Sequence, residues 1–369
     1  MRAYMKERRR LNAMLKIDAI LLAVFAVSIA AYYLLRARPG FADEVCRVFS
    51  APTRAMLGKL WGIVPFSAAE LFYIVCILFV IFHVIYTIVR VRRSFMRLRQ
   101  LLHRVLVLLA AASFLWSLYG WLWGVEYYAR GFSDETGIPT AAPANVEELF
   151  KVTAGFLAAA NALSSEVPRD NDGHFVCDTD AIFDKAPTLY DNLAEYFPNL
   201  AGECRRPKPM MFSKVMSAMG FTGVYFAYTG ESNINVDIPG CFIPSTVAHE
   251  LAHQLGYASE QECNFIGILA CISSGDTSYS YSGYLCGLVY LMNALYSSDY
   301  EAWSYLREYF SPELETDWRD NSAYWEKYDS PVDTFFENLY DGYLKGNGQS
   351  LGIYSYDACV TMLVEYFKA

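Results

Sequence analysis

The sequence predicts a mostly helical α+β domain preceded by an anchor of three transmembrane helices. Three uncharged apolar runs occupy residues 19–35, 71–89 and 105–125. With its flanks, each run can cross a hydrocarbon core about 30 Å thick, which takes roughly 20 helical residues. The chain after residue 126 is long enough for one domain with its own core, and it shows helical periodicity with two short strand patterns.

We expect the anchor to cover residues 1–126 and the outer domain to cover residues 145–369, with Pro139 and Pro143 marking a linker at 127–144. The first apolar run is long and no small-residue cleavage site follows it, so we expect an anchor and not a cleaved signal peptide. The three helices are expected at about residues 17–36, 69–89 and 105–125.

Charge predicts the orientation of this anchor. Basic residues cluster at 1–16 and 90–104, and such clusters mark cytoplasmic segments. The N-terminus should therefore be cytoplasmic, and the third helix should deliver the outer domain to the far side of the membrane. Residues 1–124 carry 17 Lys and Arg against 5 Asp and Glu, whereas the rest of the chain carries 13 against 34. An acidic outer domain does not suggest nucleic-acid binding.

The run His249-Glu250-Leu251-Ala252-His253 has the spacing that a zinc hydrolase needs. On a helix, residues four apart share one face, so His249 and His253 can both direct an imidazole nitrogen at one Zn²⁺ ion. Glu250 can then take a proton from the metal-activated water. The chain has only five His, which makes a chance match to this pattern rare.

Two carboxylates are candidates for the third ligand. Gly256 is a natural helix stop, after which the chain can turn back towards the metal. Ser259 and Glu262 have the spacing of a capping box, which gives Glu262 a structural role and leaves Glu260 free to bind the metal. Glu260 is therefore the expected ligand, with Glu262 as the alternative. Asn264 lies one turn beyond Glu260, where its amide can orient a ligating imidazole.

These motifs resemble those of gluzincins, a branch of the HExxH zinc metallopeptidases, in which a second helix carries a Glu followed four residues later by Asp or Asn. The stretch from Tyr228 to Phe265 is similar to an uncharacterised bacterial family with three N-terminal transmembrane helices and an extracytoplasmic HExxH domain. The resemblance implies a zincin-like fold, a Zn²⁺ cofactor and a multi-pass protein of the bacterial cell membrane. Asn264 stands where gluzincins more often have Asp, and the step from His253 to Glu260 is short.

Two strand patterns, at 223–228 and 233–236, precede the motif helix. An exposed edge strand there can hold an extended peptide by strand addition, which makes Asn233 and Asn235 candidate substrate-binding residues; an ordinary hairpin is the alternative. Helices are expected at 145–163, 179–196, 245–256, 260–273, 282–297, 300–309, 332–346 and 356–367.

Other polar residues give weaker indications. A tyrosine can donate a hydrogen bond to the transition state, and the candidates are Tyr279, Tyr281, Tyr284, Tyr354 and Tyr356. The nine cysteines form no CxxC pair, and both a Cys177–Cys204 disulfide and buried free thiols are possible. His103 and His174 are expected at the surface.

The function predicted from these patterns is a membrane-anchored zinc peptidase that hydrolyses peptide or protein substrates outside the cell. Intramembrane proteolysis fits less well, because residues 241–262 are too polar to lie in a bilayer. A non-catalytic zinc-binding sensor or scaffold is the alternative from another class, although a purely structural site has no use for Glu250.

Overall fold

The computed structural model describes residues 1–141, 145–352 and 358–368, and it divides into two compact units. Unit 1 comprises Met1–Arg54 and Ala68–Ala129. Unit 2 comprises Ala55–Ser67 and Arg130–Ala369. This division differs from the expected one in two places. Unit 2 includes a segment between the first two apolar runs, Ala55–Ser67, and residues 130–141 of the expected linker.

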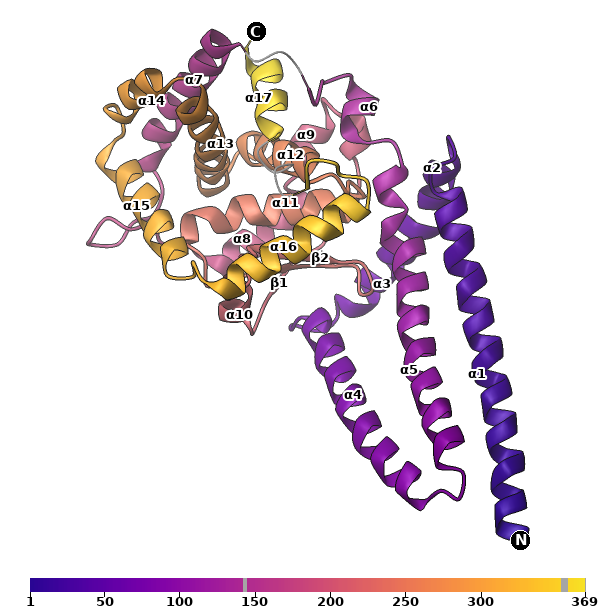
Figure 1. Ribbon diagram of the computed structural model, residues 1–369. Coiled ribbons are helices and arrows are strands. Elements are labelled where there is room, and N and C mark those ends of the chain that lie inside the picture. The colour runs from indigo at the N-terminus through magenta and orange to yellow at the C-terminus, as the bar shows by residue number, and fades with distance from the viewer. Residues whose placement is uncertain (142–144, 353–357, 369) are drawn as a thin grey trace. The chain divides into compact units, whose positions relative to one another are not determined.

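Unit 1 contains three helices that are long and apolar enough to cross a membrane. They are α1 (Arg2–Leu35), α4 (Ala68–Arg93) and α5 (Arg97–Tyr119), which continues through a π-helical turn at Gly120–Gly124 (Figure 1). Most apolar side chains of these helices are exposed, as lipid-facing side chains must be. Shorter elements complete the unit: α2 (Phe41–Val45), a π-helix (Cys46–Ser50), the first residues of α3 (Ala51–Trp61) and a 3-10 turn (Glu126–Tyr128).

The expected surface position of His103 is wrong. His103 lies on α5, is 4 % exposed, and places its Nδ1 atom 2.6 Å from Oδ2 of Asp18 on α1. A polar side chain within an otherwise apolar helix bundle is stabilised by such a partner. His174, by contrast, is exposed as expected and pairs with Asp320.

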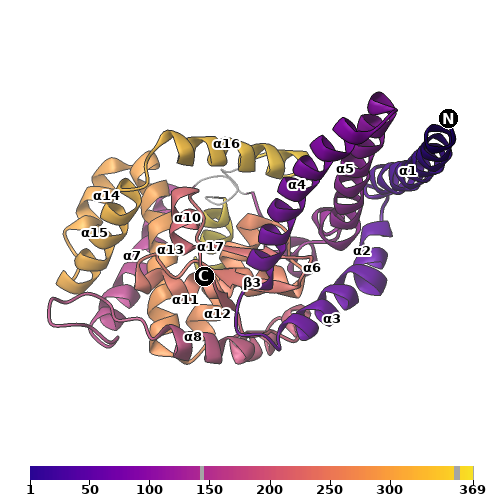
Figure 2. The same cartoon turned by 90° about the horizontal axis from the view of Figure 1, so that it is seen from below.

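The core of unit 2 is built from helices around the motif. Helix α11 (Ile243–Leu255) packs on α12 (Glu260–Ser273) and α13 (Thr277–Ser298), and α7 (Val146–Ser164) packs on α13. Figure 1 shows α11 and α12 in the middle of the unit, and Figure 2 shows α14 (Tyr300–Arg307), α15 (Pro312–Glu326) and α16 (Pro331–Gly346) along its border. The remaining helices are α6 (Phe132–Thr136), α8 (Thr179–Lys185), α9 (Asp191–Ala194), α10 (Ser213–Ala218) and α17 (Cys359–Phe367).

A small sheet accompanies these helices. Its strand order is β1 (Lys208–Pro209), β3 (Glu231–Ile234), β2 (Gly223–Phe226). Strand β3 is central, parallel to β1 and antiparallel to β2, and all its residues are buried. Both strands that the sequence predicts are present, although β3 begins two residues before the expected range of 233–236. Of these two strands, β2 is the one at the edge.

The helical predictions differ from the structure in several places. Helix α13 begins at Thr277, five residues before the expected start at 282. The helix expected at 179–196 is interrupted by a 3-10 turn at Ala186–Thr188, because Pro187 cannot donate a helical hydrogen bond. Helix α15 was not predicted, although Ser311 caps it and Pro312 opens it, as Ser330 and Pro331 open α16. The predicted helix at 356–367 begins outside the described residues, and α17 covers the rest.

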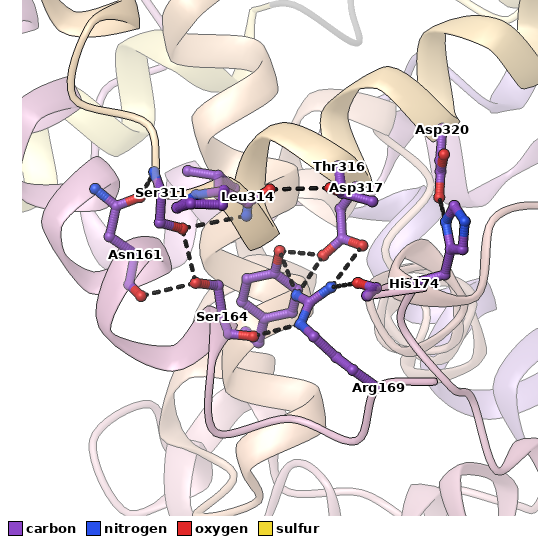
Figure 3. Close-up of polar contacts among 12 residues, drawn as sticks. Asn161, Ser164, Arg169, His174, Ser311, Leu314, Thr316, Asp317 and Asp320 are labelled. Atoms are coloured by element: carbon purple, nitrogen blue, oxygen red, sulfur yellow. Dashed lines mark hydrogen bonds and ion pairs between the residues drawn. The ribbon is translucent and has the colours of Figure 1, made fainter. Parts of the chain in front are cut away.

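A buried ion pair attaches α15 to the core (Figure 3). The guanidinium of Arg169 donates to both carboxylate oxygens of Asp317, at 3.1 and 2.7 Å. The hydroxyl of Tyr281 also donates to Asp317, and Ser164 bonds to Ser311 at the start of α15. This network fixes the helix that carries one wall of the cleft described below.

Candidate metal centre and cleft

Helix α11 brings the two motif histidines together. It opens with Pro244 in its first turn and ends at Gly256, whose φ of +113° is the left-handed conformation that favours glycine. His249 and His253 are one turn apart, and their ring centroids are 4.8 Å apart. The predicted helix and its predicted end are both confirmed.

The carboxylate of Glu260 completes a cluster with these imidazoles. Its Oε2 atom lies 3.2 Å from Nε2 of His249 and 3.5 Å from Nε2 of His253. Ligand atoms around a tetrahedral zinc ion, with bonds of about 2.0–2.2 Å, lie roughly 3.3–3.6 Å apart. The separations therefore match a metal site, and this is the one such cluster in the described part of the chain.

The other atoms of the three side chains have partners that fix their orientation. Nδ1 of His249 lies 2.7 Å from Oδ1 of Asn264, and Nδ1 of His253 lies 2.7 Å from the carbonyl of Tyr257. Tyr340 of α16 donates from its hydroxyl to Oε1 of Glu260 at 2.7 Å. Because each Nδ1 faces an acceptor, each Nε2 is left as the nitrogen that can bind a metal.

Electrostatics keep Glu260 ionised. Burial alone would raise the pKa of its carboxyl group, but the charges of His253 and His249 hold that pKa well below the usual range. The Oε2 atom has no hydrogen-bond donor among the described residues and lies between the two imidazoles. A buried carboxylate oxygen without a hydrogen-bond donor is suited to binding a cation.

Glu250 lies beside this cluster on the same helix. It is 4 % exposed, and burial raises the pKa of its carboxyl group despite the opposing charges of His249 and His253. Its Oε2 atom has no hydrogen-bond partner among the described residues. Gly223 of β2 approaches so closely that a Cβ there would lie 2.7 Å from Oε1 of Glu250. The sheet therefore confines the carboxylate from one side.

Glu262 does not belong to the cluster, and the capping box expected with Ser259 is not formed. Ser259 precedes α12 without a side-chain hydrogen bond. Oε1 of Glu262 instead accepts from the backbone amide of Ser133 at 2.9 Å, in the first turn of α6. Because Gly131 has no side chain, its backbone can lie close to this carboxylate. Glu262 thus has a structural role, but a different one from that predicted.

The candidate substrate-binding residues Asn233 and Asn235 are corrected by the sheet order. Both are fully buried, because they lie on and just after the central strand β3. The side chain of Asn233 bonds to Ser67 and to the carbonyls of Val224 and Glu231. Asn235 donates to Ser217 and to the carbonyl of Phe221. Neither faces the cleft.

A cleft of about 470 Å³ opens beside the cluster, and His249, Glu250 and Asn264 are in its lining. Its walls come from the segment 219–223, from α15 through Asn321 and Trp325, and from α16 through Asp333, Glu337 and Tyr340. The last three residues are spaced by four and three on α16, a pattern visible in the sequence once α16 is known to face the site.

The tyrosines singled out from the sequence that the structure describes do not line this cleft. Tyr279 donates to the carbonyl of Ile182, Tyr281 belongs to the Asp317 network, and Tyr284 packs on Phe156. Tyr354 and Tyr356 lie outside the described residues. Among the described residues, the tyrosines in the lining are Tyr290 and Tyr340, and neither was predicted.

All nine cysteines are free thiols, so the Cys177–Cys204 disulfide is not formed. Cys263 is fully buried behind the cluster, where its sulfur lies 3.2 Å from the carbonyl of Tyr257 and 3.3 Å from Nδ1 of His253. Burial raises the pKa of the Cys263 thiol to about 11, which keeps it protonated near neutral pH.

Comparison with known proteins places the chain in a family without assigning it a reaction. No curated protein and no solved structure matches it. A family model described as "Protein of unknown function (DUF3810)" matches residues 46–364, which include α4, α5 and nearly all of unit 2. With most of its length matched by that model, the chain belongs to the DUF3810 family.

Proposed function

We propose that this protein is a membrane-anchored, zinc-dependent peptidase. One observation carries the proposal: Nε2 of His249, Nε2 of His253 and Oε2 of Glu260 converge beside the buried carboxylate of Glu250. Two imidazoles and a carboxylate form a typical donor set of catalytic zinc sites, which keep a further position open. A zincin-like fold is part of the same proposal, supported by the helix–edge strand pair α11 and β2.

His249, His253 and Glu260 would hold the metal, and Asn264, Tyr257 and Tyr340 would orient those three ligands. When bound, zinc would lower the pKa of a water molecule and polarise the scissile carbonyl.

Glu250 supplies the proton transfers. Its carboxylate takes a proton from the attacking water and returns it to the nitrogen of the leaving amine. Its raised pKa brings the carboxyl group closer to the pH at which one group can both accept and donate a proton. Confinement by Gly223 holds the carboxylate at the edge of the cleft.

The edge strand β2 is suited to hold substrate. Gly223, at the start of β2, lines the cleft, and the other side of β2 pairs with β3. An extended peptide that pairs with an edge strand is fixed by backbone hydrogen bonds, whatever its side chains. This arrangement supports a peptide substrate in preference to a small molecule.

Gly223→Ala tests the confinement of Glu250. The new Cβ would lie 2.7 Å from Oε1 and 2.8 Å from Cγ of Glu250, so the carboxylate has to move. We expect the turnover of a cleaved peptide to fall by about tenfold or more, because displacement of a catalytic group slows the reaction. The zinc content should be unchanged. Gly155→Ala, on α7 with open space around it, is the matched control and should keep full activity. Equal rates in both variants would contradict this role of Gly223.

We also propose that the N-terminus is cytoplasmic and unit 2 is outside the cell, as the basic segments at 1–16 and 90–104 indicate. Alkaline phosphatase fused after residue 369 should be active, because it folds only outside the cytoplasm, and a fluorescent protein that folds only in the cytoplasm should be dark there. The same pair fused within residues 94–96, between α4 and α5, should give the opposite result. A cytoplasmic signal from the C-terminal fusion would overturn the orientation.

Metal analysis of the purified full-length protein, combined with digestion of a broad peptide library, tests the function itself. We expect about one zinc ion per chain, cleavage of a subset of peptides, loss of cleavage with a chelator, and recovery with added zinc. Zinc without any cleavage would favour the sensor or scaffold alternative. Absence of zinc would contradict both the zinc peptidase and the zinc-binding sensor or scaffold.

A further inference from the structure

The outer unit has an exposed apolar surface of unusual composition. Its three exposed phenylalanines, among the described residues, are Phe66, Phe212 and Phe335, at 41 %, 50 % and 62 %. The other exposed aromatic side chains of unit 2, among the described residues, are tyrosines, which have a polar end. Concentrated apolar exposure marks a surface that contacts a partner or a membrane.

These phenylalanines belong to two neighbouring groups, which we call the apolar rim. The first group comprises Ile63, Phe66, Met211, Phe212 and Val215, all at least 41 % exposed. Its two segments are connected, because the ammonium group of Lys208 donates to the carbonyl of Val64 and Met211 follows Lys208 by three residues. Val215 lies on α10, which begins four residues after the end of β1 and is drawn below and to the left of β1 in Figure 1.

The second group is a stripe on α16. Val332, Phe335 and Leu339 are 51–62 % exposed and share one face of the helix. The opposite face carries Asp333, Glu337 and Tyr340 into the cleft. Between residues 332 and 340, helix α16 thus turns polar side chains towards the cleft and apolar side chains outward, the reverse of an ordinary surface helix.

The two groups flank the cleft. The segment that follows α10 forms one wall, where a Cβ on Gly220 would lie 2.6 Å from Oδ1 of Asp333. On the same side, the ring of Phe221 packs edge-on against Tyr340, with centroids 5.2 Å apart. The apolar rim therefore lies on the outer surfaces of two elements that enclose the candidate site.

Chain connectivity indicates what lies next to the first group of the rim. Ser67, whose hydroxyl donates to Asn233 at 2.7 Å, is fixed in unit 2, and α4 begins at the next residue. The apolar run of α4 starts at residue 71, only about 6 Å further along the helix. The interfacial layer of a bilayer is roughly 5–8 Å thick, so Ile63 and Phe66 must lie at or near lipid headgroups.

We propose that the outer unit rests on the surface of its own bilayer through the apolar rim, and that its cleft takes polypeptide segments lying at that surface. Phenylalanine and aliphatic side chains are those that amphipathic helices insert at the headgroup–acyl boundary. The evidence for the lipid contact is the exposure of the apolar rim and its connection to α4 through Ser67. The substrate class rests in addition on the proposed peptidase function.

Photo-crosslinking tests the lipid contact without any need for activity. The full-length protein is placed in vesicles of phosphatidylethanolamine and phosphatidylglycerol, with benzoylphenylalanine at Phe212 or Phe335. Tyr196 and Tyr300, exposed at 77 % and 59 % outside the rim, are the matched control positions. We expect lipid adducts at both rim positions and at neither control position. Equal adducts at all four positions, or adducts only to a second polypeptide, would overturn the contact with lipid.

A second measurement tests the substrate class. Phe212→Ser combined with Phe335→Ser should slow cleavage of a lipid-tethered peptide by about tenfold or more, through loss of effective concentration, and leave the same peptide in solution unaffected. An equal effect on both peptides would exclude the membrane-surface substrate. Lipid adducts without cleavage of any peptide would instead reject the peptidase function and leave the lipid contact standing.

Discussion

Replacing Glu250 with Gln should reduce peptide hydrolysis by several orders of magnitude while the protein keeps its zinc. The amide has nearly the shape of the carboxylate, so the packing against Gly223 is preserved. It cannot take the proton from the attacking water, and loss of a general base together with its charge has an effect of this size. Glu250 is also outside the ligand cluster, so metal binding has no reason to fall.

The measurements for Glu250→Gln are zinc per chain, the unfolding midpoint and the single-turnover rate on a cleaved peptide. Glu337→Gln is the matched control, because Glu337 is another carboxylate in the cleft lining and is not one of the three clustered residues. We expect a much smaller change in rate for this control. A Glu250→Gln enzyme with the original rate would show that Glu250 is not the base.

Glu260→Ala should lose zinc, whereas Glu262→Ala should retain it. Only Glu260 has an oxygen between the two imidazoles, at 3.2 and 3.5 Å from their Nε2 atoms. Loss of one of three protein ligands removes both a donor atom and the negative charge that offsets the metal's charge. The pair is informative because the two residues are only two positions apart on α12.

Glu262→Ala should show its effect in stability. The carboxylate accepts a hydrogen bond from Ser133, and its removal leaves that part of α6 without an acceptor. We expect the free energy of unfolding to fall by about 1–2 kcal/mol, measured by chemical denaturation. Zinc loss in Glu262→Ala with retention in Glu260→Ala would reverse the assignment of the third ligand.

Local patterns in the sequence predict much of the candidate site. The spacing of His249 and His253, the stop at Gly256 and the position of Asn264 all depend on one helix or on two helices joined by a short turn. Their geometry is set by helical periodicity and by a single glycine conformation, so few outcomes are open. The structure contains each of these features.

The features that the sequence analysis missed depend on long-range packing. Tyr340 reaches Glu260 from 80 positions away, and Glu262 finds its partner in α6 and not in its own helix. Asn233 is buried because β1 adds to the outer side of β3, and nothing in residues 223–236 reveals that third strand. Helix α15 is an exception to this explanation. It was missed despite its cap because its composition is highly polar.

The discontinuity of unit 2 has a consequence for biosynthesis. The ribosome makes Ala55–Ser67 before α4 and α5, but Lys208 and Asn233, to which this segment bonds, emerge more than a hundred residues later. The segment therefore remains without these partners until α4 and α5 and the chain that follows them have been made. Unit 2 can therefore be completed only after α4 and α5 have been made, and a shortened chain that starts at Arg130 would lack the Ala55–Ser67 piece of this unit.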